Sequence, residues 1–193
     1  MDIRSSPSLD RTVLTNSLAA DFRLVSLVPI MEPEIVAVLR GTSGADLMRG
    51  TADSELLLGR AGDDRLRAGA DDDVLCGGRG QDRLIGGAGE DRFLFNGPLG
   101  QAHADRLVDF ESGVDRVQLA TALFGVDAPG QIAAGSFALS SRGQAAEADD
   151  RIIFNPVTGR LFFDPDGSGA AERQLIAVLD PDSGLSAADV WLI

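Results

Sequence analysis

The chain is short of the side chains on which most protein chemistry depends. It has no Tyr and no Lys, and it has one Cys, one His and one Trp among 193 residues. A single cysteine allows no disulfide framework within the chain and no zinc cluster built on cysteines. The single histidine, His103, excludes an H-E-x-x-H zinc site. No run of 18 apolar residues is present, so the sequence predicts no transmembrane helix.

Positive charge is also scarce. The formal net charge is −13, and every basic residue is an arginine. This balance argues against binding to nucleic acid or to an anionic membrane by charge. The N-terminal region has no basic stretch followed by a clean apolar run, so no cleaved secretory signal is expected.

Glycine and acidic residues are abundant, and they recur with a fixed period of nine. Residues 41–94 divide into six nonamers: GTSGADLMR, GTADSELLL, GRAGDDRLR, AGADDDVLC, GGRGQDRLI and GGAGEDRFL. The last two fit the pattern G-G-x-G-x-D-x-U-x, where U is a large apolar residue. An acidic residue holds position 6 of every nonamer: Asp46, Glu55, Asp64, Asp73, Asp82 and Asp91. Position 8 is apolar throughout: Met48, Leu57, Leu66, Leu75, Leu84 and Phe93.

The nonamer has a physical explanation. Glycines at positions 1, 2 and 4 accept φ > 0 and allow a sharp turn. Such a turn aims backbone carbonyls at one point, and position 6 adds a carboxylate. Hard oxygen donors of this kind suit Ca²⁺, which takes about six to eight of them. Positions 7–9 form a short strand, whose position-8 side chain points inward while its neighbours point outward.

By these nonamers the chain resembles the RTX, or hemolysin-type, calcium-binding repeat family, in the C-terminal modules of type I-secreted exoproteins. The resemblance implies an all-β fold with a parallel β-roll, Ca²⁺ as the bound ion, and a secreted, extracellular protein of a Gram-negative bacterium. It also implies the type I secretion apparatus as a partner. The alternative for the block is a glycine-rich acidic linker, but a linker does not place a large apolar residue at every ninth position.

Two nonamers complete one coil, so turns of odd repeats stack on one flank and turns of even repeats on the other. This arrangement predicts four calcium sites, and the longer side chain of Glu55 makes its site the weakest. The paired acids are Asp46 with Asp64, Asp64 with Asp82, Glu55 with Asp73, and Asp73 with Asp91. Further candidate ligands are the turn residues Gly59, Gly62, Gly69, Asp71, Gly77, Gly78, Gly80, Gly87 and Gly89.

The repeats divide the chain into three parts. Residues 1–40 form an N-terminal segment that is partly flexible and could supply a capping strand. Residues 41–94 form the β-roll, and residues 95–193 form a β-rich, mostly antiparallel region that flanks and caps it. Three coils at ~4.8 Å spacing make a short stack whose end strands need a cover.

The two sheets of the roll differ on their outer faces. The outward positions of repeats 2 and 4 are apolar: Leu56, Leu58, Val74 and Cys76. Those of repeats 3 and 5 are mostly charged: Arg65, Arg67, Arg83 and Ile85. An apolar face is normally covered, so residues 22–39 or part of the C-terminal region are expected to pack on it, with a partner chain as the second possibility. Cys76 is then a small buried hydrophobe in preference to a reactive thiol.

After the repeats, residues 105–119 read as strand, turn, strand, with the turn at 111–113. This stretch resembles the D-x-I-x-D-F-x-x-G-x-D-x-I-D-L phrase that follows RTX repeats in serralysin-type and epimerase-type modules. Asp109, Phe110 and Asp115 match the phrase, while Gln118 stands in place of its second-strand Asp.

Residues 151–154 and 160–163 read as strands around a hairpin-like turn. The following D-P-D-G-S-G stretch, residues 164–169, admits two interpretations. It is either a fifth calcium site that uses Asp164 and Asp166, or an Asx-type turn between strands. It is not an EF-hand, because Gly167 lies at position 4 of the loop and Leu175 stands where an EF-hand has its final Glu.

The chain ends with Asp189 followed by Val190, Trp191, Leu192 and Ile193. This ending resembles the uncleaved signal of type I secretion substrates, although four apolar residues also make an ordinary last strand. His103 is interpreted as a surface residue in preference to part of a catalytic triad. The leading hypothesis is therefore a non-enzymatic module that folds on extracellular calcium after export. The alternatives are a calcium-stiffened binding module for a polysaccharide or another exoprotein, and a non-catalytic fragment of a larger RTX enzyme.

Overall fold

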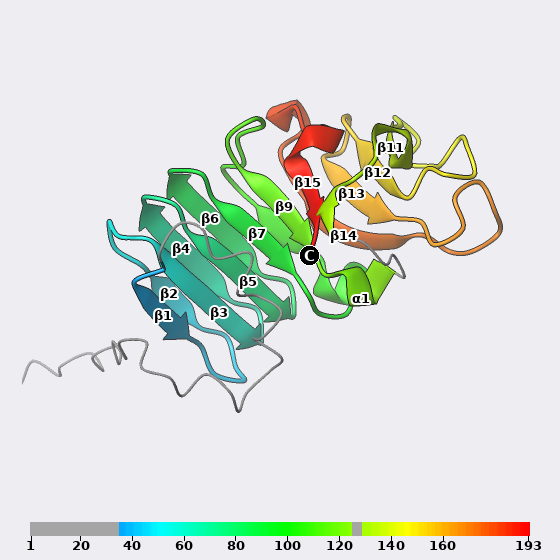
Figure 1. The fold of residues 1–193 in the computed structure, drawn as a ribbon. Coiled ribbons are helices and arrows are strands. Elements are labelled where there is room, and N and C mark those ends of the chain that lie inside the picture. The colour runs from blue at the N-terminus through cyan, green and yellow to red at the C-terminus, as the bar shows by residue number, and fades with distance from the viewer. Residues whose placement is uncertain (1–34, 125–128) are drawn as a thin grey trace, which may run out of the picture.

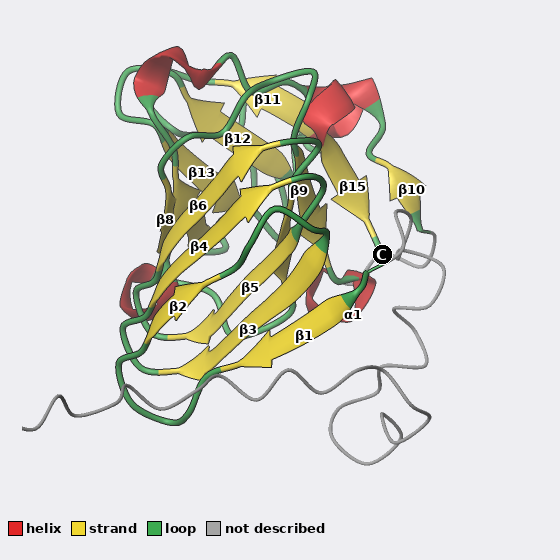
Figure 2. Ribbon diagram, turned by 90° about the vertical axis from the view of Figure 1, so that its left-hand side faces the viewer, coloured by secondary structure: helices red, strands yellow, loops and turns green. Residues whose placement is uncertain are grey.

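The computed structural model describes residues 35–124 and 129–193, which form two β-sheets that face each other (Figures 1 and 2). Sheet A has seven strands, in the order β1 (Ala37–Arg40), β3 (Glu55–Ala61), β5 (Val74–Arg79), β7 (Arg92–Phe95), β9 (Arg116–Leu119), β15 (Val190–Leu192) and β10 (Gly130–Gln131). Sheet B has eight, in the order β11 (Phe137–Leu139), β12 (Ile152–Asn155), β13 (Arg160–Phe163), β14 (Gln174–Val178), β8 (Asp105–Leu107), β6 (Arg83–Ala88), β4 (Arg65–Ala70) and β2 (Leu47–Arg49).

Within the repeats the chain winds as a coil that visits the two sheets alternately. Even repeats supply β3, β5 and β7 to sheet A, and odd repeats supply β2, β4 and β6 to sheet B. All these strands pair in parallel, and each residue lies beside the residue eighteen positions later. Leu57 pairs with Leu75 in sheet A, and Leu66 pairs with Leu84 in sheet B. The expected parallel β-roll is therefore confirmed.

The core lies between the sheets and follows from the position-8 residues. Leu57, Leu66, Leu75, Leu84 and Phe93 are completely buried. Each of these side chains points inward from its strand, while the residues directly before and after it point outward. One such row per sheet gives a continuous apolar interior, and burial of side chains of this size stabilises the fold by about 1.5–3 kcal/mol each.

The sheets continue past the last nonamer. Strand β8 pairs in parallel with β6, and β9 pairs in parallel with β7. Two further parallel pairs, β8 with β14 and β9 with β15, join the C-terminal region to the roll. The region then closes with antiparallel pairs between β12, β13 and β14 and between β10 and β15. Figure 1 shows β12 to β14 in yellow to orange and β15 in red, beside the green strand β9.

The hairpin expected after residue 150 is present. Strands β12 and β13 are antiparallel, and Gly159 in the intervening turn has φ of 68°. Before it, strand β11 pairs in parallel with β12. A single four-residue helix, α1 (Thr121–Phe124), is the only α-helix among the described residues. Within this part of the chain no helix has the length and apolar character to cross a membrane.

The outer face of sheet A carries a second apolar cluster, as expected. Ile35, Val38, Leu56, Val74, Cys76 and Leu94 are buried together, and Leu58 and Ile193 are partly buried against them. The segment 35–39 thus takes part in this cluster, as does the last residue of the chain. Residues 22–34, the rest of the segment expected to pack there, lie outside the described residues.

Cys76 belongs to this cluster and not to a reactive site. Its thiol lies 3.3 Å from the side-chain oxygen of Asn96, to which it can donate. Burial raises the pKa of the thiol to about 12, with smaller contributions from the charges of Asp105 and Asp82. The thiolate is therefore scarce at neutral pH, which agrees with a small buried hydrophobe.

Candidate metal sites

The position-6 carboxylates form a ladder along each flank of the roll. In every step, one carboxylate oxygen accepts the backbone N–H of the position-6 residue one coil earlier. On one flank, Asp64 accepts from Asp46 at 2.8 Å and Asp82 accepts from Asp64 at 2.8 Å. On the other, Asp73 accepts from Glu55 at 2.7 Å and Asp91 accepts from Asp73 at 3.0 Å. The four pairs of acids expected from the sequence are therefore brought together.

Three of these carboxylates have a second oxygen with no hydrogen-bond partner. They are the Oδ2 atoms of Asp64, Asp73 and Asp82, all buried. A buried carboxylate oxygen without a partner costs free energy that a cation would offset. The unpartnered oxygens are therefore candidate ligands for a positive ion.

The position-1 glycines complete the cradle around these oxygens. A Cβ added to Gly59 would lie 2.5 Å from Asp64 Oδ2 and 2.5 Å from the carbonyl oxygen of Gly77 in the next coil. A Cβ added to Gly77 would likewise collide with the Asp82 carboxylate. These glycines do not have positive φ, so that part of the sequence-based explanation is wrong for position 1. Glycine is needed there because oxygens from two coils converge where a side chain would stand.

Positions 2 and 4 do use the left-handed region. Gly78, Gly80, Gly87 and Gly89 have φ between 102° and 136°, and Gly62 and Gly69 have φ of 111° and 143°. A side chain on any of them would meet a backbone carbonyl or amide of the preceding coil. Asp71, at position 4 of the fourth repeat, has φ of 61°, which is consistent with the ability of Asp to adopt the left-handed region. Arg60, at position 2, also adopts positive φ, at 80°.

The first two repeats satisfy their acids in another way. Thr42 donates to Asp46 Oδ2 from its backbone N–H at 2.6 Å and from its hydroxyl at 2.9 Å. Thr51 donates to Glu55 in the same manner, with distances of 2.8 and 2.5 Å. Both threonines stand at position 2, where later repeats have Gly or Arg. A hydroxyl therefore takes up the carboxylate oxygen that the third, fourth and fifth repeats leave without a partner.

Burial sets the electrostatics of the stack. It raises the pKa of Asp64 to about 6 and that of Asp73 and Asp91 to about 7, in each case against the lowering effect of a backbone hydrogen bond. The neighbouring carboxylates of the same flank raise these pKa values further. Without a cation, keeping these buried carboxylates charged and close together therefore costs free energy at neutral pH.

Side chains alone do not build a metal site here. Among residues 35–124 and 129–193, no cluster of three or more His, Cys, Asp or Glu side chains could hold an ion. An ion in the cradle must draw on backbone carbonyls as well as on carboxylates, and such oxygen-rich mixed sets are typical of Ca²⁺.

The loop that follows β13 brings Asp164 and Asp166 together. The backbone N–H of Asp166 donates to Asp164 Oδ1 at 3.3 Å, and Asp166 Oδ2 accepts from Ala171 at 3.0 Å. The first bond is that of an Asx-type turn. Burial, with a contribution from the Asp166 carboxylate, raises the pKa of the buried Asp164. The loop therefore has both the turn and the paired carboxylates that the two sequence-based interpretations require.

His103 and Asp189 have structural partners. His103 Nδ1 accepts the backbone N–H of Gly80 at 3.2 Å. Asp189 is buried and accepts from the hydroxyls of Ser112 and Ser186 at 2.7 and 2.9 Å, which ties the last strand β15 to the 111–113 turn. The apolar end of the chain is thus a strand of sheet A.

Two members of the ladder were missed in the sequence. Asp105 accepts the N–H of Asp82 at 3.0 Å, and Asp115 accepts that of Asp91 at 3.0 Å. Both follow the nonamers but take the position-6 place in the stack. The signal was present in GQAHADRLV, residues 100–108, which keeps positions 1, 6 and 8 after a five-residue insertion.

Comparison with known families gives the same assignment. The profile of the RTX calcium-binding nonapeptide repeat matches in four copies, over residues 38–66, 49–84 and 77–96. The repeat block belongs to the RTX family. RTX nonapeptide repeats bind Ca²⁺ and are typical of secreted proteins. The matched ranges together span all six nonamers, although the profile counts four copies.

Two solved structures resemble the RTX fold of this chain. The AlgE6R2 subunit of a mannuronan C5-epimerase from Azotobacter vinelandii is 21% identical with a TM-score of 0.50, over 84% of this chain and 94% of that one. The AlgE6R3 subunit of the same enzyme is 28% identical with a TM-score of 0.49, over 77% and 79% of the two chains. No curated protein sequence matches the chain significantly.

Proposed function

We propose that this RTX chain is a calcium-dependent folding and secretion module. The observation that carries the proposal is the set of buried, unpartnered oxygens on Asp64, Asp73 and Asp82, together with the Gly77 carbonyl that converges with Asp64 Oδ2 at Gly59. Proteins rarely bury such atoms without a partner. A calcium ion between coils would satisfy them and would cancel the repulsion along each flank.

The calcium affinity of the sites and the calcium concentration inside and outside the cell together determine where the chain folds. Extracellular calcium modules bind at about 10⁻⁴–10⁻³ M. Cytosolic calcium lies well below this range, so the roll stays without ions and largely unfolded before export through a narrow channel. Outside the cell, binding drives folding. At ten times the dissociation constant, the four sites of the repeats, if independent, contribute roughly 5–6 kcal/mol, comparable to the stability of a small domain.

The proposed ligands are the position-6 acids with carbonyls of the turns. The strongest sites lie between the acids of repeats 3 and 5 and between those of repeats 4 and 6. The sites that begin at Asp46 and Glu55 are weaker, because Thr42 and Thr51 already occupy those carboxylates. The Asp164 and Asp166 loop is a further, separate calcium site in this proposal, with the paired carboxylates as its support.

The C-terminal segment has two successive roles in the proposal. While the chain is unfolded, Asp189 and the four apolar residues after it are accessible to the type I secretion apparatus. After folding, the same residues become β15 and its flanks. The proposed role is non-enzymatic. In it, His103 stabilises the turn at Gly80, whose backbone N–H donates to His103 Nδ1.

A calcium titration followed by far-UV circular dichroism tests the proposal. The wild-type chain should gain β structure on addition of calcium, and Asp73→Ala and Asp82→Ala should lose this transition or shift it to higher calcium. Asp150→Ala is the control, because Asp150 is also buried but accepts from Ala146 and Glu147 in a local turn away from the stack. Equal order of the wild-type chain in excess chelator would contradict the proposal.

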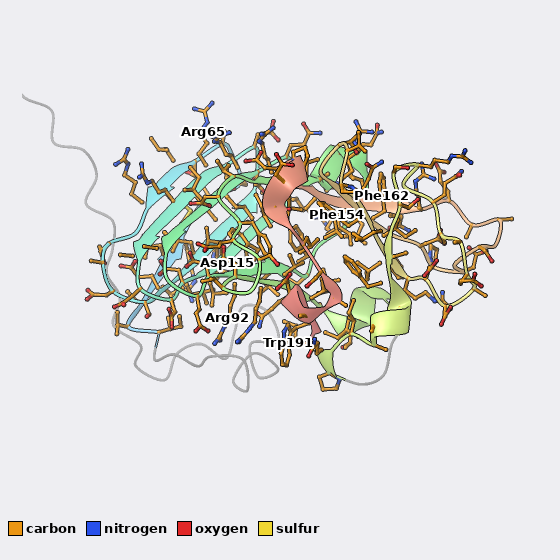
Figure 3. The ribbon with its side chains drawn as sticks, turned by 90° about the horizontal axis from the view of Figure 1, so that it is seen from above. Arg65, Arg92, Asp115, Phe154, Phe162 and Trp191 are labelled. Carbon is orange, nitrogen blue, oxygen red and sulfur yellow. The ribbon has the colours of Figure 1, made fainter. Side chains whose placement is uncertain are left out.

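A second role is supported by the outer face of sheet B, which carries a row of arginines. Arg65, Arg83 and Arg106 lie in register on adjacent strands, and the row continues through Val178 to Arg160. All four arginines are exposed. Figure 3 shows Arg65 pointing away from the body of the protein, on the opposite side from Arg92 and Trp191. Strand spacing of ~4.8 Å suits a polymer with a negative charge at regular intervals.

We infer from this row that the folded module also binds an anionic polysaccharide. The binding should weaken with salt, as contacts between exposed charges do. A pull-down with a uronate polymer, against a neutral glucan, tests this role. Combined replacement of Arg65 and Arg83 by Gln should reduce retention, while Arg40→Gln, an exposed arginine of strand β1 in sheet A, should not. Equal retention of both variants would exclude it.

A further inference from the structure

The apolar cluster on the outer face of sheet A is buried more deeply than a single sheet can bury it. Strands β1, β3, β5 and β7 pair in parallel, and their position-8 residues point the other way, toward sheet B. The outward side chains are only 2–6% exposed: Val38, Leu56, Val74, Cys76 and Leu94. Sheets that are parallel throughout are normally covered on both faces. Burial of this depth therefore requires a further layer over the outer face.

The strands of the described residues do not supply this layer. The other members of the cluster are Ile35, which precedes β1, Leu58 on β3, and Ile193, which follows β15. In residues 35–124 and 129–193, both sheets are accounted for, and sheet B packs on the opposite face. Ile35 is itself buried in the cluster, so the chain reaches β1 along this face.

The segment that precedes Ile35 has the composition of a cover. Residues 24–31 read L-V-S-L-V-P-I-M, with one polar residue in eight. The other stretch outside the described residues, 125–128, is only four residues long and leads to β10, at the edge of sheet A opposite to β1. The N-terminal segment is therefore the part of this chain that fits the outer face.

The length and the prolines of this segment indicate how it lies. The strands from β1 to β7 are three spacings apart, about 14 Å in all, and eight extended residues span about 26 Å. The apolar run is thus long enough to cross the cluster. Pro29 and Pro33 have no backbone N–H to donate. They favour packing across the face through side chains over pairing as another strand at the edge of β1.

We propose that residues 22–34 form a strap across the outer face of sheet A, with the apolar side chains of 24–31 packed on the cluster. The strap crosses β3, β5 and β7, one strand from each even repeat, and so ties the coils of the roll together. It also closes an apolar face that would otherwise favour association of chains. The inference goes beyond the calcium sites, which lie in the turns, and holds whether or not these bind an ion.

Cys76, the single cysteine of the chain, gives a test of proximity within the cluster. In the full chain at saturating calcium, a second cysteine is introduced at one strap position at a time and the protein is oxidised. The variants are Leu24→Cys, Val25→Cys, Leu27→Cys, Val28→Cys and Ile30→Cys. A disulfide requires the two Cβ atoms to lie within about 3.5–4.5 Å, so at least one variant should form an intramolecular disulfide with Cys76, identified by peptide mass mapping.

Leu14→Cys and Leu18→Cys, in the same N-terminal region but outside the strap, are the controls and should link to Cys76 at least tenfold more slowly. Absence of an intramolecular disulfide in all five strap variants would overturn the proposal. A disulfide between the strap of one chain and Cys76 of another would overturn it too, because the cover would then come from a second copy.

The accessibility of the Cys76 thiol gives a second test that needs no cross-link. Combined replacement of Leu27 and Ile30 by Asp should raise the rate of maleimide labelling at least tenfold, whereas combined replacement of Leu14 and Leu18 by Asp should leave it unchanged. Far-UV circular dichroism at saturating calcium checks that both double variants keep the β structure of the wild type. Equal labelling rates at equal β structure would show that the strap does not cover Cys76.

Discussion

The residue at position 2 decides how each turn of the stack satisfies its acid. Where this residue is Thr, as in Thr42 and Thr51, the hydroxyl and backbone N–H both donate to the acid four residues later. Where it is Gly or Arg, as in the later repeats, an oxygen of Asp64, Asp73 or Asp82 stays without a partner. In the first five repeats, the residue at position 2 thus separates turns whose acid accepts from a threonine hydroxyl from turns whose acid keeps a buried, unpartnered oxygen.

Replacement of Thr51 by Val tests this distinction. The change removes the hydroxyl bond to Glu55 at similar volume, and a hydrogen bond to a charged group contributes about 1.5–3 kcal/mol. We expect the free energy of unfolding, measured by urea denaturation, to fall by about 1–2 kcal/mol at a calcium concentration just sufficient for folding, with a smaller loss at saturating calcium. Thr158→Val, at an exposed position in the β12–β13 turn, is the matched control. An equal loss at the two calcium concentrations would contradict the idea that the hydroxyl replaces an ion.

Replacement of Gly59 by Ala tests the cradle. The new methyl group would press on Asp64 Oδ2 and on the Gly77 carbonyl. We expect the calcium concentration at the folding midpoint to rise at least tenfold, which corresponds to about 1.4 kcal/mol. Gly44→Ala is the control, because a Cβ there would have no atom within 4 Å and φ is not positive. Similar midpoints for the two variants would show that the space beside Gly59 is not used by an ion.

At the scale of elements, each flank of the roll is a column of buried carboxylates. Asp73 and Asp91, on the even flank, have pKa values raised to about 7 by burial. An acid whose pKa is higher in the folded chain binds its proton more tightly when folded. Its protonation therefore stabilises the fold fully below the ordinary pKa of 3.8, and this contribution is lost as the pH rises through 6–7.

The calcium-free chain should accordingly contain more folded structure at pH 5 than at pH 8. Protons and calcium compete for the same oxygens, so calcium affinity should fall over the same interval as the pH decreases. Far-UV circular dichroism in calcium-depleted buffers and isothermal titration at both pH values measure the two effects. A β-structure content of the calcium-free chain that is constant or rises from pH 5 to pH 8 would contradict this prediction.

The elements themselves were largely predictable. A period of nine with apolar position 8 specified β2 to β7 and their division between two sheets, and turn residues located the β12–β13 hairpin. The stack positions of Asp105 and Asp115 were not predicted, because insertions of five and six residues hide the period. The role of the threonines was missed too, since a hydroxyl that replaces an ion leaves no mark in the spacing of acids.

At the scale of the whole molecule, the two sheets have unlike outer faces. Sheet A buries Leu56 and Val74 in an outer apolar cluster, whereas sheet B exposes Arg65 and Arg83. Each face is built from every second repeat, and hydrogen bonds join residues eighteen positions apart. The identity of a face therefore depends on whether a repeat is odd or even.

Deletion of one coil and deletion of one repeat together test whether the two outer faces are interchangeable. Removal of residues 59–76 takes out one whole coil and should leave a shorter protein that still folds on calcium. Removal of residues 59–67 takes out one repeat, moves the strands that follow to the opposite sheets, and should cause aggregation. Size-exclusion chromatography and circular dichroism with calcium measure both outcomes. Equal behaviour of the two deletions would mean that the faces are interchangeable.

This alternation imposes a parity rule on the gene. A duplication or loss of fifty-four nucleotides preserves the facing of every downstream strand, while one of twenty-seven nucleotides reverses it, because a coil spans eighteen residues. Lineages of this protein should therefore lengthen and shorten in steps of two repeats. A step of one repeat should survive only where a second change returns the apolar residues to the covered outer face of sheet A.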